Sequence, residues 1–578
     1  MKTNFKRMLS FISALVIILG VFSGCSQKKD ESKPTGSQSE KSVENEQESR
    51  PKKPEPITLT MFCSDPIASY DDNYEETPVG KKIKEVTLKI EFPVGDYKQR
   101  LSLMMASGEY PDIIAPKDQS HSLVEAGAVV DLTDLIEKYG PNIKKYFGDY
   151  LWRLRYSLQD KSIYGIGGKP YDPPKTYIND AAFAIQHRAL EDAGYPQIKS
   201  LEDYENVIRS FVSKNPKTEE KPTIGVSLIC SDGWRYYISL TNPAAFATGA
   251  PTTNGEFIID PETYQAMLHH RRPEEKEYFR WLNKLYNTGL LDPESFTQSY
   301  DTYQSKIASG RVVGLIDAYW QYNPPQLKLK ESGKLDMMYA HFPVVLDPSK
   351  HKYASRQSTG FNTNYALCIS KTSKNKERAI QYIDYMLSEE GMITRGWGIE
   401  GVHYDVVNGK RLMKDEWKFM ASKDSLKFAK TTGIGVLWIF PHYGTSRTDA
   451  SGQYYTHYDE ESALMGYTEE DRKTLSAYGV KKYPDLFPPT SDFKELPYGE
   501  AWHLQGLTSN PEAQLINTKA HDIILKGIIK AIMAKPDQFD SIWDAMQKEL
   551  IDIGIEKAEA EMTKLIKERI ELWEPKNN

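Results

Sequence analysis

Aromatic rings placed beside charged side chains are the residues of this sequence best suited to chemistry, and the chemistry they favour is ligand recognition. The chain contains 10 Trp, 36 Tyr and 20 Phe residues. Trp and Tyr combine a large apolar face with a polar group that needs a hydrogen-bond partner. A carbohydrate has matching chemistry, because its C–H faces stack on rings while its hydroxyl groups form hydrogen bonds. We expect most of these rings to pack in the core, so those on turns and strand ends are the candidates.

The candidates for ligand contact lie on turns or in glycine-flanked loops, where a rigid scaffold presents side chains to a cleft. Trp234 and Arg235 follow an expected strand at 224–229, and Trp397 and Glu400 lie in a loop whose glycines let the backbone approach a ligand closely. For each candidate, packing or a structural ion pair is the alternative to ligand contact. The full set is Asp65, Trp234, Arg235, Tyr319, Trp320, Trp397, Glu400, Trp438 and His442.

Motifs for catalysis are absent from the sequence. It has no G-x-S-x-G nucleophile motif, no H-E-x-x-H zinc motif, no P-loop and no dinucleotide-binding glycine fingerprint. Acidic pairs such as Glu389-Glu390 fall in segments with a helical pattern, where we expect them to be solvated. No Cys or His spacing is typical of a metal site. We therefore expect a protein that is not an enzyme and that uses no metal and no cofactor.

The first 25 residues have the pattern of an export signal, with a basic start and an apolar run over 9–22. That run is shorter than the ~20 apolar residues of a membrane-spanning helix. Residues 22–25 resemble the lipobox of bacterial lipoproteins, in which the cysteine thiol receives a lipid, so Cys25 is the expected lipid-attachment residue. A plain secretion signal that happens to contain a cysteine is the alternative.

The segment after the signal is expected to be a disordered tether. Residues 26–56 are rich in Ser, Lys, Glu, Gln and Pro and hold almost no large apolar side chains, so they cannot bury enough surface to offset the entropy of ordering. The folded part is expected to begin near Ile57. The net charge of −7 argues against a general nucleic-acid binder. The other cysteines, Cys63, Cys230 and Cys368, are expected to be buried free thiols, although one disulfide is an open alternative.

Strands and helices are expected to alternate from the start of the folded part. Alternating apolar residues predict a strand at 57–62 and a second at 86–92, and an amphipathic helix is expected at 97–106. Such alternation is typical of α/β proteins, and about 520 folded residues suggest two lobes, because single cores rarely exceed ~300 residues. The C-terminal stretch is expected to form helices over 539–553 and 558–570.

Several segments resemble those of one protein family, and they occur in the family's order. The first are 103–114, with the sequence LMMASGEYPDII, and 126–133, with AGAVVDLT. The later ones are 308–314, with ASGRVVG, and the stretches 377–391 and 397–404. The chain resembles the extracellular solute-binding proteins of bacterial ABC importers, and in particular the large sugar-binding lipoproteins of Gram-positive bacteria.

The resemblance implies an α/β fold of the type II periplasmic-binding-protein kind, in which hinge strands join two lobes and the ligand occupies the cleft between them. We expect lobe 1 to comprise 57–175 and 316–355, and lobe 2 to comprise 176–315 and 356–578 with the C-terminal helices. In that family the strand end that carries Tyr319 and Trp320 faces the ligand. Calcium loops occur in some members after the second-lobe helix pair, but the matching residues 214–222 lack the ligand spacing, so no calcium is expected there.

The function implied by the resemblance is capture of an oligosaccharide or sugar derivative. The protein would be a monomer on the outer face of the cell membrane, held by a lipid anchor, and would deliver its ligand to the membrane subunits of an ABC permease. A peptide or another solute is an alternative ligand. An extracellular glycan-degrading enzyme and a receptor subunit for a sensor kinase are the alternative classes of function.

Overall fold

The computed structural model describes residues 56–83, 86–168, 181–231, 233–250, 257–260, 262–354, 366–458, 464–493, 498 and 510–574. The chain divides into two units, Met1–Pro54 and Glu55–Asn578. The expected signal at 1–25 with Cys25, and the expected tether at 26–56 except Pro56, lie outside the described residues. Among the described helices, none has the length and hydropathy needed to cross a membrane.

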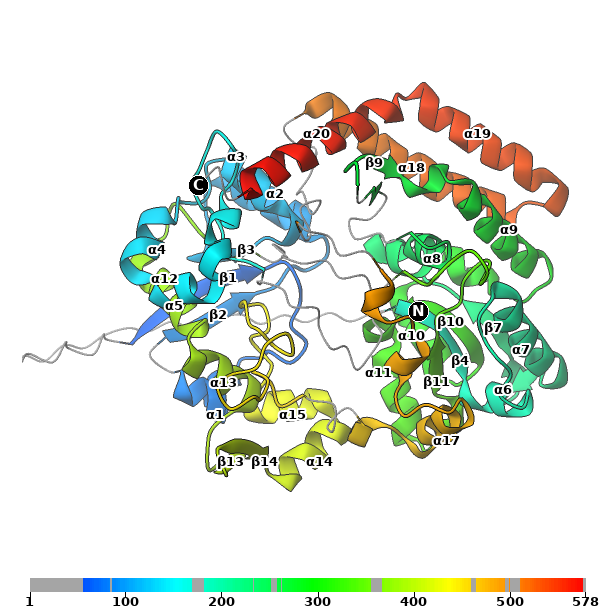
Figure 1. Cartoon of the computed structure of the whole chain (residues 1–578), viewed down its shortest axis with the longest axis horizontal. Helices are drawn as coiled ribbons and strands as arrows, with labels where there is room; N and C mark the ends of the chain where they lie inside the picture. The colour runs from blue at the N-terminus through cyan, green and yellow to red at the C-terminus, as the bar shows by residue number, and fades with distance from the viewer. Residues whose placement is uncertain are drawn as a thin grey trace, which may run out of the picture. The chain divides into compact units, whose positions relative to one another are not determined.

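The first sheet is built by three N-terminal strands and β12, in the order β12-β3-β1-β2 (Figure 1). Strand β1 (Ile57–Cys63) pairs in parallel with β2 (Val86–Glu91) and β3 (Ile113–Ala115), and β12 (Cys368–Ile369) is antiparallel to β3. The expected strands near 57 and 86 are thus present. The helices associated with this sheet are α1 (Pro78–Lys82), α2 (Tyr97–Ser107), α3 (Ser120–Glu125), α4 (Thr133–Tyr139), α5 (Pro141–Phe147), α12 (Lys376–Met386) and α13 (Glu389–Trp397).

The second sheet has the order β11-β4-β10-β7 (Figure 1). The inner strand β10 (Val312–Ala318) is buried along its whole length. It runs parallel to β7 (Ile224–Ser227) and antiparallel to β4 (Ala181–Gln186). Strand β4 also pairs with β11 (Tyr339–Phe342). The helices of this part are α6 (His187–Asp192), α7 (Leu201–Lys214), α8 (Asn242–Ala247), α10 (Tyr300–Ala308), α11 (Tyr319–Glu331) and α17 (Glu469–Ala477).

The pairing of the strands differs from the expected lobe boundaries. Strands β10 and β11 belong to the second sheet, although 316–355 was expected in lobe 1. Strand β12 belongs to the first sheet and α12 packs on α4 and α5, although the range from 356 was expected in lobe 2. An apolar run identifies a strand but carries no information about its partner strand. This is why β10 and β11 were expected beside the first sheet, and β12 beside the second.

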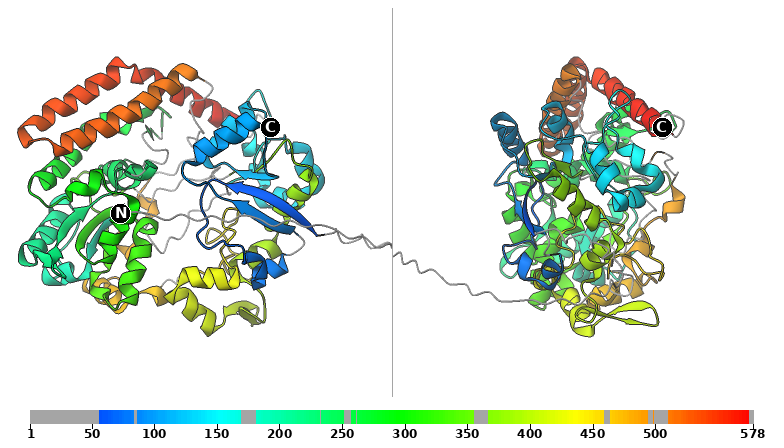
Figure 2. Two further views of the ribbon diagram at one scale, coloured as in Figure 1. Left: turned by 180° about the vertical axis from the view of Figure 1, so that it is seen from behind. Right: turned by 90° about the vertical axis from the view of Figure 1, so that its left-hand side faces the viewer.

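The C-terminal helices form a separate layer beside α9 (Pro273–Asn287). Helices α18 (Pro511–Met533) and α19 (Phe539–Asp552) run alongside each other and contact α9 (Figures 1 and 2). The last helix, α20 (Ile555–Trp573), reaches the first part of the chain, where the indole nitrogen of Trp573 donates a hydrogen bond to the carbonyl of Arg153 at 3.0 Å. The helices agree with those expected over 539–553 and 558–570.

The remaining elements are short. Two antiparallel strands, β13 (Tyr404–Val407) and β14 (Lys410–Met413), form a hairpin that precedes α14 (Asp415–Lys423) and α15 (Ser425–Thr432). Smaller hairpins join β5 (Lys217–Thr218) with β6 (Lys221–Pro222), and β8 (Phe257–Ile259) with β9 (Ala266–Leu268). Cys63, Cys230 and Cys368 are buried free thiols, as expected.

Candidate functional site

Trp234 and Trp320 form the centre of the candidate site. Trp234 lies in a short 3-10 turn (Gly233–Arg235) after β7, and Trp320 lies in the first turn of α11, directly after β10. Their ring centroids are 5.7 Å apart with an interplanar angle of 34°. The two residues remain 39% and 46% exposed. Two large rings that contact each other and keep much of their surface in solvent form a platform on which an amphipathic ligand can stack.

Arg235 lies beside Trp234 of this platform, and Gln321 connects it to the buried Asp317. The guanidinium carbon of Arg235 lies 3.7 Å from the ring centre of Tyr300 and 5.1 Å from that of Trp234. Its Nη1 donates to Gln321 Oε1 at 2.8 Å, and Gln321 Nε2 donates to Asp317 Oδ1 at 2.7 Å. Burial raises the pKa of Asp317 to about 7, although hydrogen bonds to its carboxylate act in the opposite direction. The orientation of Arg235 is therefore coupled to a buried carboxyl group.

Side chains from the first sheet complete the site. Lys117 Nζ lies 5.1 Å from the ring centre of Trp234, 5.6 Å from that of Tyr97 and 2.7 Å from Asp65 Oδ1. The hydroxyl of Tyr97 donates to Asp118 at 2.6 Å. The site therefore combines rings, a cation and carboxylates from two separate sheets.

The register of the two sheets explains why these residues meet. Asp65, Tyr97 and Lys117 follow the carboxyl ends of β1, β2 and β3, which run parallel to one another. Trp234 and Trp320 follow the carboxyl ends of β7 and β10, which are also parallel. In open α/β sheets the carboxyl ends of parallel strands lie at one edge, and ligands commonly bind outside that edge. We refer to Asp65, Tyr97, Lys117, Trp234, Arg235 and Trp320 as the inter-sheet cluster.

Tyr319 lies next to Trp320 in the chain but lines a different cavity. This cavity has a volume of about 270 Å³ and lies between α11 and the start of α15, with Ser425 in its wall. Its other rings include Tyr458, Tyr467 and Tyr483, and the hydroxyl of Tyr483 donates to Asp471 at 2.6 Å. The cavity combines aromatic faces with polar groups, which are the features that a sugar ring requires.

The other sequence candidates lie outside the inter-sheet cluster. Trp397 is 5% exposed, and its indole nitrogen donates to the carbonyl of Tyr454 at 2.9 Å, so its position is structural. Glu400 forms an isolated bridge with Tyr404 at the start of the β13–β14 hairpin. Trp438 is 38% exposed and His442 is exposed, both in the segment after α15. Ligand contact by these four residues stays a prediction.

Comparison with known proteins places this architecture in a family. The model of the bacterial extracellular solute-binding protein family matches residues 70–399, which is more than half of the chain. The chain belongs to this family. Among curated proteins, this solute-binding protein is 23% identical over 357 residues to the fructooligosaccharide ABC transporter substrate-binding protein FusA of Streptococcus pneumoniae, covering 59% of this chain and 63% of FusA. It is 22% identical to lipoprotein LipO of Bacillus subtilis, covering 61% of this chain and 68% of LipO.

Solved structures show the same fold. FusA of Streptococcus pneumoniae in complex with kestose superposes with a TM-score of 0.63 at 16% identity, covering 88% of this chain and 99% of that one. A solute-binding protein from Bifidobacterium longum infantis, described as binding HMO and as associated with an ABC transporter, gives a TM-score of 0.61 at 15% identity, covering 89% and 99%. The expected two-lobe, type II periplasmic-binding-protein-like fold is thereby confirmed.

One group of described residues in this solute-binding protein has the composition of a metal site. His269, His270 and Glu275 are fully buried, and their ligand atoms lie within 4.8 Å of one another. Burial tends to raise the pKa of Glu275, but the two imidazoles, His269 foremost, lower it to about 2. Arg272 Nη1 lies 3.6 Å from Glu275 Oε1. Positive charge already surrounds this carboxylate, which favours a structural network over a bound cation.

Lys117 and Tyr97 were missed among the sequence candidates. Lys117 directly follows the apolar run Ile113–Ala115 and Pro116, and its backbone has a positive φ of 57°. The position after a short buried strand is the same signal that identified Trp234. This signal was therefore present in the sequence and was not applied to Lys117.

Proposed function

We propose that this protein is the substrate-binding component of an ABC importer, and that it captures an oligosaccharide or sugar derivative and delivers it to a permease. The observation that carries the proposal is the inter-sheet cluster, in which Trp234 and Trp320 from one sheet meet Lys117 and Asp65 from the other. A ligand that stacks on the rings and accepts or donates hydrogen bonds on the opposite side contacts both walls at once. Membership of the solute-binding family and the sugar-binding relatives support this ligand class.

The proposed mechanism is a shift between open and closed arrangements. A ligand shifts such an equilibrium only by the difference between its affinities for the two states. Contacts to both walls exist together only when the walls are close, so binding stabilises the closed state, as in hinged binding proteins. The permease then distinguishes the liganded protein by its closed arrangement, and no bond of the ligand is broken.

The proposal places the protein on the outer face of the cell membrane. The lipid at Cys25 would hold it there, and residues 26–56 would let the folded unit move relative to the anchor. Replacement of Cys25 by Ser should move the protein from the detergent phase to the aqueous phase in Triton X-114 partitioning and abolish incorporation of labelled fatty acid. Retention of both properties in Cys25→Ser would contradict the anchor.

The ligand is tested on residues 55–578, which form one unit. Isothermal titration calorimetry with neutral and acidic oligosaccharides of one to six units, followed by mass spectrometry after overnight incubation, measures affinity and ligand integrity together. Binding of one saccharide class with intact ligand supports the proposal. Shortened products would indicate a glycan-degrading enzyme, and binding of peptides without any saccharide would indicate a peptide-binding protein.

A further inference from the structure

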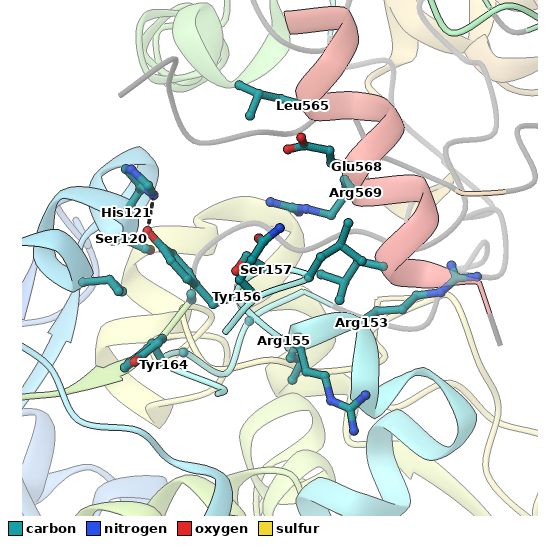
Figure 3. A pocket seen from close by; sticks show the side chains of 18 of the residues that line it. Ser120, His121, Arg153, Arg155, Tyr156, Ser157, Tyr164, Leu565, Glu568 and Arg569 are labelled. Carbon is teal, nitrogen blue, oxygen red and sulfur yellow. Dashed lines mark hydrogen bonds between the residues drawn. The ribbon is translucent and has the colours of Figure 1, made fainter. Parts of the chain in front are cut away.

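A cavity of about 380 Å³ has two walls from distant parts of the chain. One wall is formed by α3 and by residues 153–159, and the other by Leu565, Glu568, Arg569 and Leu572 of α20 (Figure 3). Ligand pockets typically have volumes of ~300–1,000 Å³, so this cavity suits a molecule of about one sugar ring. None of the six residues of the inter-sheet cluster lines it.

Arg569 extends from α20 into the space between the two walls (Figure 3). Within the described residues its guanidinium forms no ion pair, and the centre of the Trp573 ring lies 5.7 Å from Arg569 Cζ. Burial lowers the pKa of this guanidinium to about 10. Arg569 is half-buried, and a charge partly removed from water without a counter-charge is unfavourable, so a bound anion reduces that penalty.

The wall opposite Arg569 is polar and includes two further arginines, Arg153 and Arg155. The hydroxyl of Tyr156 lies 2.5 Å from His121 Nδ1 and donates to Glu125 Oε1 at 2.9 Å. Burial lowers the pKa of His121; the carboxylate of Glu125 opposes this shift, and the charge of Arg569 adds to it. The imidazole of His121 and the hydroxyl of Tyr156 can exchange hydrogen bonds with a ligand. Both walls line the same cavity.

The charges around the cavity favour an anion. Arg153, Arg155 and Arg569 line it together with the carboxylates of Glu125 and Glu568, so cations are in excess. A guanidinium presents parallel N–H donors that match the two oxygens of a carboxylate or phosphate. The apolar side chains of the lining, which include Leu154, Leu158, Leu565 and Leu572, leave room for the carbon skeleton of the ligand.

We infer that this cavity is a second binding site, for a small molecule of about one sugar ring that carries a carboxylate or phosphate group, and that Arg569 pairs with this group. The inference does not rest on the proposed function, because none of its residues belongs to the inter-sheet cluster. The cavity is also lined by Gly165, Gly167 and Ala366. A bound molecule therefore contacts both α20 and the first part of the chain.

The test is calorimetry on residues 55–578 with four probes: glucuronate, glucose 6-phosphate, inorganic phosphate and neutral glucose. We expect binding of an anionic probe, weaker binding at high salt, and no binding of glucose at the same concentrations. A preference for glucuronate assigns a carboxylate ligand, and a preference for either phosphate probe assigns a phosphate ligand. Arg569→Gln should weaken the binding at least tenfold, while Arg100→Gln, which removes an exposed guanidinium paired with Glu91, should leave it unchanged.

Two further variants keep the test decisive if Arg569→Gln folds poorly. Glu568→Gln removes a carboxylate from the lining and should strengthen binding of the anion several-fold, an effect that loss of structure does not produce. Trp320→Ala should leave the dissociation constant of the anion unchanged. Absence of binding of every anionic probe, or equal affinity of the wild type, Arg569→Gln and Glu568→Gln, would overturn the inference.

Discussion

The ammonium group of Lys117 lies over the indole of Trp234, 5.1 Å from its ring centre, and so joins a loop of the first sheet to a loop of the second. Asp65 Oδ1 lies 2.7 Å from the same ammonium group and keeps it in position. A cation over an indole contributes about 0.5–2 kcal/mol, depending on how far it is removed from water. The two walls of the proposed binding site therefore contact each other directly, and this contact contributes to the balance between open and closed arrangements.

Replacement of Lys117 by Met should shift this balance toward the open arrangement. The variant keeps most of the aliphatic stem but loses the charge, so the contact to Trp234 loses its electrostatic part. We expect a larger radius of gyration for the unliganded protein by small-angle X-ray scattering, and saccharide affinity that is lower by about three- to tenfold, as ~1 kcal/mol implies. Lys81→Met, which removes an exposed lysine paired with Glu76, is the matched control. An unchanged radius and affinity in Lys117→Met would contradict this role.

Removal of either platform ring should weaken ligand binding without unfolding the protein. Trp234 and Trp320 keep much of their surface exposed, so Trp→Ala at either position removes little core packing. Central aromatic residues of binding sites commonly contribute ~2 kcal/mol or more, so we expect the dissociation constant to rise about 30-fold in calorimetry. Phe419→Ala removes an exposed ring (62%) of α14 and should change neither affinity nor melting temperature. Equal effects of Phe419→Ala and Trp320→Ala would contradict the platform.

Part of the candidate site was predictable because position after a strand is encoded locally. Asp65, Trp234, Arg235 and Trp320 all follow predicted strands, and parallel pairing brings strand ends to one edge. Trp397 also lies beside a glycine, but it is the last residue of α13 and packs inward. A glycine near a tryptophan does not say which way the ring points. That direction depends on tertiary packing, which the local sequence does not determine.

Lobe membership was less predictable than the strands themselves. A strand was expected directly before Tyr319 and Trp320, yet the pairing of β10 with β4 and β7 depends on contacts between distant segments. Burial of every position of β10 shows that both faces are covered but does not identify the sheet. The exchange of 316–355 and the region around β12 between the lobes follows from this. The two-lobe fold could be predicted, but the positions at which the chain passes from one lobe to the other could not.

A buried ion pair supports the loop that precedes α10. Lys306 Nζ lies 2.7 Å from Asp292 Oδ2, and both side chains are 5% exposed. Lys306→Met should reduce the free energy of unfolding by about 3–5 kcal/mol, because it leaves the carboxylate of Asp292 buried without its cation. Urea denaturation followed by tryptophan fluorescence measures the change. Lys526→Met, at an exposed pair with Asp522, should change it by less than about 0.5 kcal/mol. A similar small effect at Lys306 would show that water reaches the pair.

The raised pKa of Asp317 should make stability depend on pH between about 4 and 7. Burial raises this pKa to about 7, whereas an exposed aspartate has a pKa of about 3.9. Between these values the folded protein binds more protons at this residue than the unfolded chain, so the contribution of Asp317 to the free energy of unfolding falls as the pH rises. Above about pH 7 both states are ionised, and the contribution becomes constant.

Asp317→Asn removes this titration and isolates it from the other carboxyl groups. The amide can keep a hydrogen bond to Tyr303, whose hydroxyl donates to Asp317 at 2.8 Å and can also accept. We expect the stability of the wild type relative to Asp317→Asn, measured by urea denaturation, to fall between pH 4.5 and 7 and to level off above that. Asp522→Asn, at an exposed residue, should show no such trend relative to the wild type. If the difference between wild type and Asp317→Asn stays constant across this range, Asp317 is ionised throughout, and Arg235 is oriented by a permanent charge through Gln321.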